Sequence, residues 1–364
     1  MSCQWHFLTY RSNSQTLTWP DRHRMFVRRF TTTEKYRKLC NNHTPQNNSI
    51  CEGSLERLTL GRTGLDVSVM GIGAGGPSQI GKKTGKTEAE SAQIILKAFE
   101  AGVNFIDTAE GYGTEPLVGI ALKDLPRDQV VISSKKSSKG HGPETVAKSC
   151  EESLRRLGTD YIDIYSLHGL LPWDYARCRD ELYPELVKLK EAGKIRFIGV
   201  SEMFNSDKTH EMVEGGFEDD LWDVIMIGFN ILNQTARESV LKKAIEQNVG
   251  IQVMFAVRKA MSNPDFLVET VKAFIQEGKI DPTDIDNLDH PLDFLLGEQG
   301  AISIPDAAYR FARFEPGTHV ILSGTGNPDH LSENIASFER GPLPTADVDR
   351  LKQIFRNVDS ITGQ

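Results

Sequence analysis

The chain has 364 residues and a mass of 40.6 kDa, and its 42 Lys and Arg residues against 50 Asp and Glu residues give a formal net charge of −8. A chain this acidic lacks the basic surface typical of nucleic-acid-binding proteins, and none of its apolar runs approaches the ~18 residues that span a bilayer. Apolar residues make up 39% and charged residues 25% of the sequence, as in ordinary globular proteins. We therefore expect neither a nucleic-acid partner nor insertion into a membrane.

The cysteines and histidines indicate neither a disulfide framework nor a metal centre. The five cysteines are an odd number and form no C-x-x-C pair, so free thiols are expected. The nine histidines include no H-E-x-x-H motif, which is the usual helical pattern of a zinc site. We predict that the protein holds no metal.

The first 50 residues differ in charge from the rest of the chain. They carry a net charge of +6, whereas residues 51–364 carry −14. We interpret residues 1–52 as a basic, disordered extension and residues 53–364 as one folded domain. An Arg-rich, acid-poor leader is also typical of organelle transit peptides, and Met25 is a second candidate for the start of the protein. The expected location is the cytoplasm, or an organelle matrix if the leader is a transit peptide.

From residue 57 onward, short strand-like runs alternate with helical stretches. Residues 57–60 and 65–69 flank a glycine-bounded turn and predict a hairpin. Helix signals follow, such as the capping box that Thr87 and Glu90 form. Eight strands separated by helices predict parallel pairing and an α/β fold of the (β/α)8 TIM barrel type, with the hairpin closing its bottom. The strands are expected at 67–72, 103–107, 130–134, 161–167, 195–201, 224–230, 249–255 and 318–323.

The longest connection, residues 256–317, lies between the seventh and eighth strands. It is expected to hold helices at 266–277 and 303–314, together with an acidic, proline-containing stretch at 281–289. Long connections of this kind are usually functional or disordered. In a barrel such a connection would lie over the mouth, where substrates bind.

Four titratable residues lie at or just after the ends of consecutive strands, where barrel enzymes carry their catalytic groups. Asp107 ends the second strand and Tyr112 lies just beyond it, while Lys135 ends the third strand. His168 ends the fourth. An ammonium beside a carboxylate stays charged and lowers the pKa of a nearby phenol, which makes Tyr112 a candidate general acid. Lys136 is a rival amine, but alternation along the strand directs only one of the two lysines to the mouth. Each residue alone is also explained by an ion pair or by packing.

These residues lie in stretches that resemble the signatures of the aldo-keto reductase superfamily. The resemblance implies a (β/α)8 barrel that binds a nicotinamide cofactor without a Rossmann domain. It also implies a catalytic tetrad of Asp107, Tyr112, Lys135 and His168, in which hydride passes from nicotinamide to a carbonyl carbon as Tyr112 protonates the oxygen. The stretches are Asp-Thr-Ala-Glu-Gly-Tyr-Gly at 107–113, the strand end at Lys135, Ser-Leu-His at 166–168, and Gly-Lys-Ile-Arg-Phe-Ile-Gly-Val-Ser at 193–201.

Two glycine-rich stretches are candidates for contact with the dinucleotide. The cluster Gly71–Gly76 lacks the G-x-G-x-x-G spacing, and we interpret it as a loop that another group approaches closely. The turn after the eighth strand leads into a helix that starts at Asn327 and Pro328, and free N–H groups at a helix start suit a phosphate. By the family pattern, this turn binds the adenosine phosphates and the helix contacts adenine. The residues concerned are Ser323, Gly324, Thr325, Gly326, Glu333 and Asn334.

The expected nicotinamide contacts depart from the family pattern at two positions. Glu202 follows Ser201 where the family usually has Asn, and Met226 stands where Gln is common. Met cannot replace the hydrogen bonds of an amide. Phe255 occupies the position of an aromatic residue that stacks on nicotinamide. The resemblance places these four residues at the cofactor.

The residues leave the choice between NADPH and NADH open. The family norm is NADP(H), but a 2′-phosphate is normally held by Arg or Lys, and residues 323–338 contain neither. Arg258, Lys259 or Arg340 would have to reach it. We expect NADP(H) from the family, with NAD(H) or dual use as the alternative.

The function that follows is an NAD(P)-dependent oxidoreductase, an aldo-keto reductase or alcohol dehydrogenase, which acts on a small-molecule aldehyde, ketone or sugar. One alternative is a regulatory subunit of the same fold that binds the cofactor with little turnover. Another is a barrel lyase in which Lys135 forms a Schiff base. Substrate choice would be set by the loops 78–86, 169–180, 203–220 and 256–300; the sequence identifies neither the substrate nor the oligomeric state.

Overall fold

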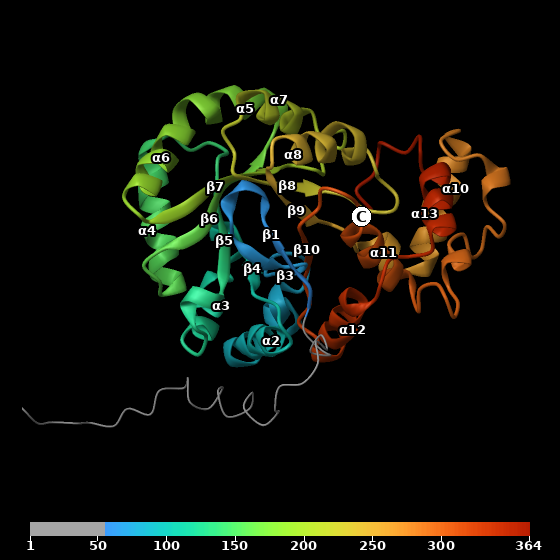
Figure 1. The fold of residues 1–364 in the computed structure, drawn as a ribbon, viewed down its shortest axis with the longest axis horizontal. Coiled ribbons are helices and arrows are strands. Elements are labelled where there is room, and N and C mark those ends of the chain that lie inside the picture. Colours follow the sequence, from blue (N-terminus) through green and yellow to red (C-terminus); the bar gives the residue numbers. More distant parts are fainter. Residues whose placement is uncertain (1–54) are drawn as a thin grey trace, which may run out of the picture. The chain divides into compact units, whose positions relative to one another are not determined.

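The computed structural model describes residues 55–364, which form a closed barrel of parallel strands surrounded by helices (Figure 1). The predictions about residues 1–52 lie outside the described residues. The strand order is β10-β3-β4-β5-β6-β7-β8-β9, so each strand lies beside its neighbour in sequence and the last strand meets the first. The predicted (β/α)8 fold is confirmed. The barrel strands are β3 (Met70–Gly73), β4 (Phe105–Asp107), β5 (Val131–Ser137), β6 (Ile162–Leu170), β7 (Ile195–Glu202), β8 (Val224–Gly228), β9 (Gly250–Met254) and β10 (Val320–Ser323).

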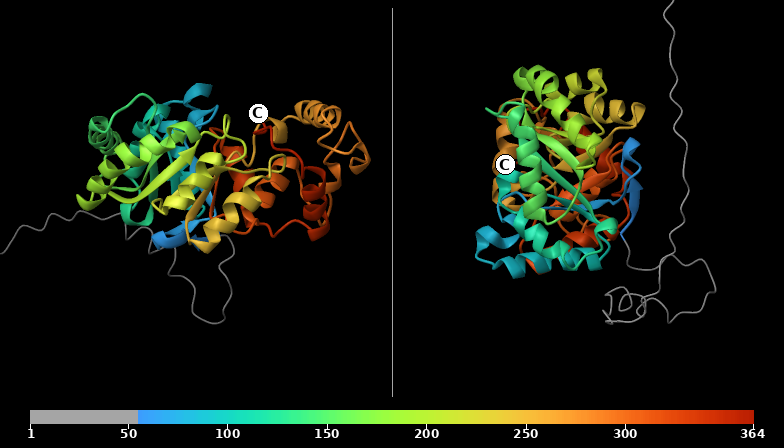
Figure 2. Two further views of the ribbon diagram at one scale, coloured as in Figure 1. Left: turned by 90° about the horizontal axis from the view of Figure 1, so that it is seen from above. Right: turned by 90° about the vertical axis from the view of Figure 1, so that its left-hand side faces the viewer.

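Helices cover the outside of the barrel, as Figures 1 and 2 show. The predicted capping box is present, because the Thr87 hydroxyl accepts from Glu90 N and the Glu90 carboxylate accepts from Thr87 N. None of the helices within residues 55–364 is both long and apolar enough to cross a membrane. The α-helices are α2 (Glu88–Glu100), α3 (Glu115–Leu122), α4 (Glu144–Leu157), α5 (Pro172–Arg177), α6 (Tyr183–Glu191), α7 (Glu211–Asp219), α8 (Lys242–Glu246), α9 (Lys259–Ser262), α10 (Pro264–Gln276), α11 (Ile304–Arg313), α12 (Pro328–Glu339) and α13 (Thr345–Ile354).

The N-terminal hairpin closes the bottom of the barrel, as predicted. Its strands β1 (Arg57–Thr59) and β2 (Asp66–Ser68) pair antiparallel. Leu60, Leu65 and Val67 form one buried apolar cluster with side chains from the barrel strands, so the hairpin removes this end of the barrel from water. The barrel residues of the cluster are Phe105, Val131, Ile164, Val224 and Val320.

The prediction of one continuous strand over 67–72 is wrong. The hairpin strand β2 ends at Ser68, and the barrel strand β3 begins at Met70. Ser68 N donates to the side-chain oxygen of Asn104, and the Ser68 hydroxyl donates to Met70 O. These local hydrogen bonds replace ladder pairing at the point where the chain leaves the hairpin.

Residues 256–317 contain the two predicted helices as α10 and α11. The acidic stretch at 281–289 is anchored to α13 and to the residues just after it, because Arg350 of α13 pairs with Asp286 at 2.8 Å and Arg356 pairs with Asp284 at 3.2 Å. In Figure 1, α10 and α13 lie beside each other next to the barrel. Much of this connection therefore forms a helical layer with the C-terminal part of the chain.

Candidate active site

A buried ion pair joins the ends of β4 and β5. The Lys135 ammonium donates to both carboxylate oxygens of Asp107, at 2.6 and 2.7 Å, and to the Thr108 carbonyl oxygen at 2.8 Å. Ser133 Oγ donates a further hydrogen bond to Asp107 at 3.0 Å. Both side chains of the pair are buried, and burial raises the pKa of Asp107 while Lys135 opposes that rise. Because all three ammonium hydrogens have acceptors, Lys135 presents no free amine for a Schiff base.

Tyr112 and His168 lie beside this ion pair. Lys135 Nζ is 5.3 Å from the centroid of the Tyr112 ring, and the Tyr112 hydroxyl is hydrogen-bonded to His168 Nε2 at 3.2 Å. Gly113, in the left-handed conformation with φ 67°, turns the chain sharply after Tyr112. The structure therefore brings together the four residues that the sequence indicated as a tetrad.

Burial sets the pKa values of the phenol and the imidazole. It raises the pKa of Tyr112; the Lys135 ammonium opposes that rise and Asp107 adds to it. The prediction that Lys135 makes the phenol more acidic overall is wrong, because desolvation outweighs the ammonium. Burial, reinforced by Lys135, lowers the pKa of His168 to about 3. Both side chains are neutral at pH 7 and able to hydrogen-bond one oxygen atom of a ligand.

The glycine cluster at 71–76 makes room for Tyr112. A Cβ atom on Gly75 would lie 2.6 Å from Cε2 of the Tyr112 ring. Only glycine allows the backbone to come this close to the ring. The stretch is therefore a close-approach loop, as predicted, and the group that approaches it is Tyr112.

Lys136, the rival amine, is directed away from the ion pair of Lys135. Its ammonium lies 3.8 Å from Glu110 Oε1, and its side chain is also buried. Burial lowers the pKa of Lys136, and Glu110 opposes this change. The expected alternation along β5 therefore places only Lys135 beside Tyr112.

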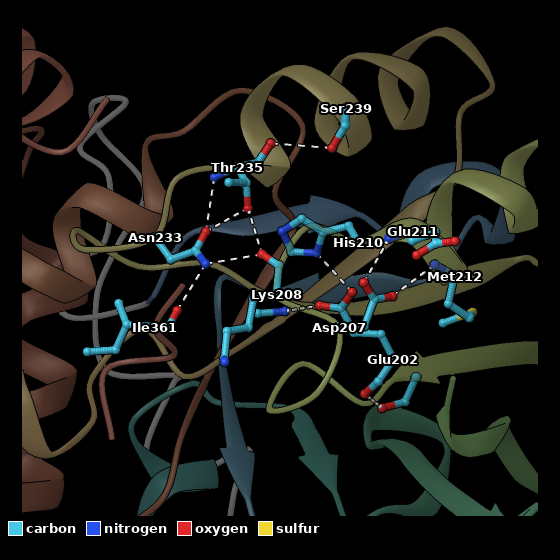
Figure 3. A network of polar contacts seen from close by, with 12 residues as sticks. Glu202, Asp207, Lys208, His210, Glu211, Met212, Asn233, Thr235, Ser239 and Ile361 are labelled. Carbon is cyan, nitrogen blue, oxygen red and sulfur yellow. Dashed lines mark hydrogen bonds and ion pairs between the residues drawn. The ribbon is translucent and has the colours of Figure 1, made fainter. Parts of the chain in front are cut away.

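Glu202, at the end of β7, belongs to a separate buried network (Figure 3). Its Oε1 accepts from Gly228 N at 2.7 Å, and its Oε2 is 2.8 Å from Nδ1 of His210. Neither the Glu202 nor the His210 side chain has exposed surface, and the His210 ring stacks on Phe204. Burial raises the pKa of Glu202, and His210 opposes that rise. A contact of this carboxylate with nicotinamide would require these hydrogen bonds to break.

The other predicted nicotinamide contacts differ in their exposure. Ser201 and Met226 are buried, and Ser201 Oγ donates to the Glu202 carbonyl oxygen at 3.3 Å. Phe255 follows β9, is only partly buried and has a left-handed backbone with φ 68°, which is rare for a bulky residue. Asn230 holds this conformation by donating from Nδ2 to Phe255 O at 3.2 Å. Of the predicted nicotinamide contacts, only Phe255 is partly exposed.

The two glycines of the turn after β10 are explained by close packing. A Cβ atom on Gly326 would lie 2.4 Å from Gly81 Cα, and one on Gly324 would lie 2.8 Å from Gly73 O. Such distances to backbone atoms exclude any side chain. The glycine pair is therefore required by the protein's own packing, and it is no longer evidence for a phosphate site by itself.

Polar groups nevertheless gather where this turn enters α12. Asn327 caps the helix with its side-chain oxygen, and Thr325 Oγ accepts from Asn327 N at 3.0 Å. Asn334 Nδ2 donates to Ser323 Oγ at 2.9 Å, and the Glu333 side chain is exposed. An exposed carboxylate and a partly exposed amide on α12, near the turn that leads into it, fit the adenosine end of a dinucleotide.

None of the three basic side chains considered for the 2′-phosphate is directed to this turn. Arg340 follows the far end of α12 and pairs with Asp306 at 3.4 Å. Lys259 Nζ lies 3.8 Å from the centroid of the Phe266 ring. Arg258 lies over the Phe255 ring, with Cζ 3.5 Å from its centroid. In these positions, none of the three side chains would contact a 2′-phosphate bound at the turn after β10.

The residues that support the ion pair were missed by the sequence reasoning. Ser133 binds Asp107 directly, and Gln252 Nε2 donates to Ser133 Oγ at 3.4 Å from the other side of the barrel. The position of Ser133, two residues before Lys135 on the same strand face, is a signal that could have identified it. No local signal identifies Gln252, because 119 residues separate it from its partner.

A parallel (β/α)8 barrel with an acid, a phenol, an amine and an imidazole at three consecutive strand ends defines a class of barrel oxidoreductases. The model of the Aldo/keto reductase family matches residues 70–356, which is most of the chain. The chain belongs to this family, whose members are NAD(P)-dependent oxidoreductases that act on carbonyl compounds.

Individual proteins are similar to the chain in sequence or in structure. The chain is 28% identical over 313 residues to NADH-specific methylglyoxal reductase of Escherichia coli K12, which covers 78% of this chain and 93% of that protein. It is 38% identical over 157 residues to L-galactose dehydrogenase of Arabidopsis thaliana, covering 40% and 48%. The holo form of an aldo-keto reductase from Bacillus halodurans superposes with a TM-score of 0.64 at 22% identity, covering 84% and 97%. An aldo/keto reductase from Klebsiella pneumoniae in complex with NADP and acetate gives 0.59 at 20% identity, covering 84% and 100%. These two structures are similar to the chain in fold.

Proposed function

We propose that the protein interconverts a small-molecule carbonyl compound and its alcohol, with Tyr112 as the general acid and base. The observation that carries this proposal is the neutral Tyr112 hydroxyl, hydrogen-bonded to a neutral His168 beside the Lys135–Asp107 ion pair. The names of the two relatives, methylglyoxal reductase and L-galactose dehydrogenase, support an aldehyde, ketone or sugar as the substrate class.

A bound nicotinamide dinucleotide supplies the hydride. Phe255, which is partly exposed and has Arg258 over its ring, would supply the aromatic ring that packs on nicotinamide. Ser323 at the end of β10, together with Glu333 and Asn334 in the middle of α12, would hold the adenosine end. Glu202 and Met226 contribute to the fold around this site and not to hydrogen bonds with the carboxamide.

The chain's own residues control the proton. Tyr112 gives its proton to the carbonyl oxygen as the carbon is reduced, and neutral His168 hydrogen-bonds the same oxygen. The Lys135 ammonium then stabilises the phenolate that remains, and Asp107 keeps the ammonium charged and in place. Burial and Lys135 both act on the charged phenolate, so Lys135 offsets part of the cost of burying that charge when the proton leaves.

We infer that the protein discriminates weakly between NADPH and NADH. Residues 323–338 contain no Lys or Arg, and Arg340 is held by Asp306. A charge-assisted contact with a 2′-phosphate would separate the two affinities by about tenfold to a hundredfold. We expect fluorescence titrations of the full chain to give dissociation constants within about tenfold of each other. A preference of a hundredfold would show that another basic group reaches the phosphate.

The proposal is tested by the substitution Tyr112→Phe. Removing the hydroxyl should lower turnover by about 10²- to 10⁴-fold, while the dissociation constant of the dinucleotide changes little. Tyr183→Phe is the matched control, because the Tyr183 hydroxyl donates to Leu221 O away from the site. Consumption of NADPH with a panel of aldehydes, ketones and sugars gives the rates. Undiminished turnover in Tyr112→Phe would overturn the assignment.

A further inference from the structure

Arg258 differs from every other arginine within residues 55–364. Each of the others has a guanidinium nitrogen within 3.4 Å of an Asp or Glu oxygen. The buried Arg310, for example, pairs with Asp306 at 3.2 Å. Arg258 has no such partner in this part of the chain. It is partly buried, so the missing partner cannot be attributed to full exposure to water.

The position of the Arg258 guanidinium is fixed by neutral groups. Its Cζ lies 3.5 Å from the centroid of the Phe255 ring, and its Nη1 donates to Asn205 Oδ1 at 3.0 Å and to Thr362 Oγ1 at 3.4 Å. Burial lowers the pKa of Arg258 to about 10, which still leaves it charged at neutral pH. A charge that is partly removed from water and lacks an anion is unfavourable, so a bound anion would stabilise this arrangement.

A hollow of about 440 Å³ lies beside the hydrogen-bond partners of Arg258, although Arg258 itself is not among its lining residues. Asn205 and Thr362, the two hydrogen-bond partners of Arg258, both line it, together with Lys208. Within residues 55–364, the Lys208 ammonium has no carboxylate partner; only the Lys208 carbonyl oxygen takes part in the network of Figure 3. None of the lining side chains is acidic. The remaining lining residues are Ser360, Ile361 and Gln364.

The contacts of Arg258 lead away from the turn proposed for the adenosine end of the dinucleotide. In the barrel, β9 lies between β8 and β10. Asn205 follows β7, and Thr362 belongs to a C-terminal segment held by Asn230, which follows β8 and donates to Thr362 O at 3.2 Å. Arg258 therefore reaches across the β8 side of the mouth, opposite to β10 and α12. An anion on this side of the mouth would be a group of the substrate rather than an adenosine phosphate at α12.

We propose that Arg258 binds an oxyanion group of the substrate, so that the protein prefers carbonyl compounds or alcohols that carry a carboxylate or phosphate over neutral ones. This rests on the proposed function only in taking the ligand at the mouth to be the substrate. A guanidinium presents parallel N–H donors that match an oxyanion. Stacking on Phe255 holds the group in place before the ligand arrives.

The proposal is tested by binding and not by turnover. The full chain, saturated with NADP⁺ so that an aldehyde cannot be reduced, is titrated with 4-carboxybenzaldehyde and with its neutral methyl ester. A second pair, 4-oxobutanoate and its methyl ester, covers aliphatic ligands. We expect the carboxylate of at least one pair to bind about tenfold to a hundredfold more tightly than its ester. Arg258→Gln should abolish this preference and Arg258→Lys should retain part of it, with NADPH and NADH affinities unchanged.

Arg350→Gln is the matched control. Arg350 also stacks on an aromatic ring, with Cζ 4.2 Å from the Phe294 centroid, but it pairs with Asp286, so its loss should leave the carboxylate preference intact. The proposal is overturned if the wild-type protein shows no preference in either pair, or if Arg258→Gln keeps it. It is also overturned if Arg258→Gln weakens NADPH and NADH binding alone, which would assign the guanidinium to a cofactor phosphate. A carboxylate preference that survives in Tyr112→Phe, combined with no turnover in the wild type, would reject the proposed reaction and leave the subsite in place.

Discussion

The two halves of the barrel mouth handle charge in different ways. At the ends of β4, β5 and β6, each polar group is matched by a neighbour, as Lys135 is by Asp107 and Tyr112 by His168. At the ends of β7 to β9, the one acidic side chain considered for the cofactor, Glu202, is withdrawn into a pair with His210, and the cation Arg258 has no acidic partner among the described residues. In the proposals above, the first half transfers the proton and the second half binds a charged group of the substrate. Substitutions in the two halves should then affect turnover and ligand binding separately.

The largest effect is expected from breaking the ion pair between Lys135 and Asp107 at the ends of β4 and β5. Lys135→Met would leave the buried Asp107 carboxylate without its counter-ion, which should lower the free energy of unfolding by about 3–5 kcal/mol and abolish most turnover. Urea unfolding followed by circular dichroism measures the first effect. Lys136→Met is the matched control on the same strand, because its ammonium is 3.8 Å from Glu110 and takes no part in the site. Equal loss of turnover in both variants would contradict the assignment of Lys135.

A smaller effect is expected from Glu202→Ala. The substitution removes the acceptor for Gly228 N and leaves His210 buried without a partner, which should lower the free energy of unfolding by about 2–3 kcal/mol. Glu202→Gln keeps an oxygen that accepts from Gly228 N and an amide group that faces His210 Nδ1, so its cost should be less than half as large. Neither variant should change the dinucleotide dissociation constant by more than about twofold in a fluorescence titration. A tenfold weakening in Glu202→Gln would show that this side chain contacts the cofactor after all.

His168 should make the stability of the protein sensitive to acid. Its pKa is lowered to about 3 in the folded protein, whereas an unfolded histidine titrates near 6.5. Between these values the unfolded state binds more protons, so acidification destabilises the fold. From pH 7 to pH 5 this group alone should reduce the free energy of unfolding by about 2 kcal/mol. Urea unfolding of wild type and His168→Gln at both pH values gives the difference, and the same pH dependence in both proteins would contradict the buried neutral imidazole.

The smallest effect is expected from Arg340→Gln. Arg340 is held by Asp306 at the far end of α12, so the ratio of NADPH to NADH affinity should change by less than about twofold. The same titration that compares the cofactors in the wild type measures this ratio. A shift toward NADH would mean that Arg340 leaves Asp306 to bind the 2′-phosphate.

The group of residues at the ends of β4, β5 and β6 could be predicted from the sequence because each of them lies at or next to the end of a recognisable strand. Asp107 and Lys135 end neighbouring strands, and alternation along β5 separates Lys135 from Lys136. In a closed parallel barrel, residues at consecutive strand ends meet without further information. The fold followed from the same regular alternation of strands and helices.

The contacts at the ends of β7 to β9 could not be predicted, because they depend on irregular backbone conformations. His210 reaches Glu202 from a left-handed position with φ 68°, which no sequence pattern revealed. The glycines at 324 and 326 indicated a phosphate loop, but they are required by the backbone atoms of Gly73 and Gly81. In each of these cases, the role of a residue is set by contact with a segment that the sequence pattern does not indicate.

The left-handed backbone of Phe255 is linked to the packing of its side chain. Glycine would adopt φ 68° without penalty, whereas a bulky residue there costs about 1–3 kcal/mol. Glycine would also remove the half-buried ring that packs near Phe204 and on which Arg258 lies, and losing a buried aromatic ring costs about 3–5 kcal/mol. The strain at Phe255 is therefore offset by the packing of its own side chain, so this backbone conformation and the aromatic ring depend on each other.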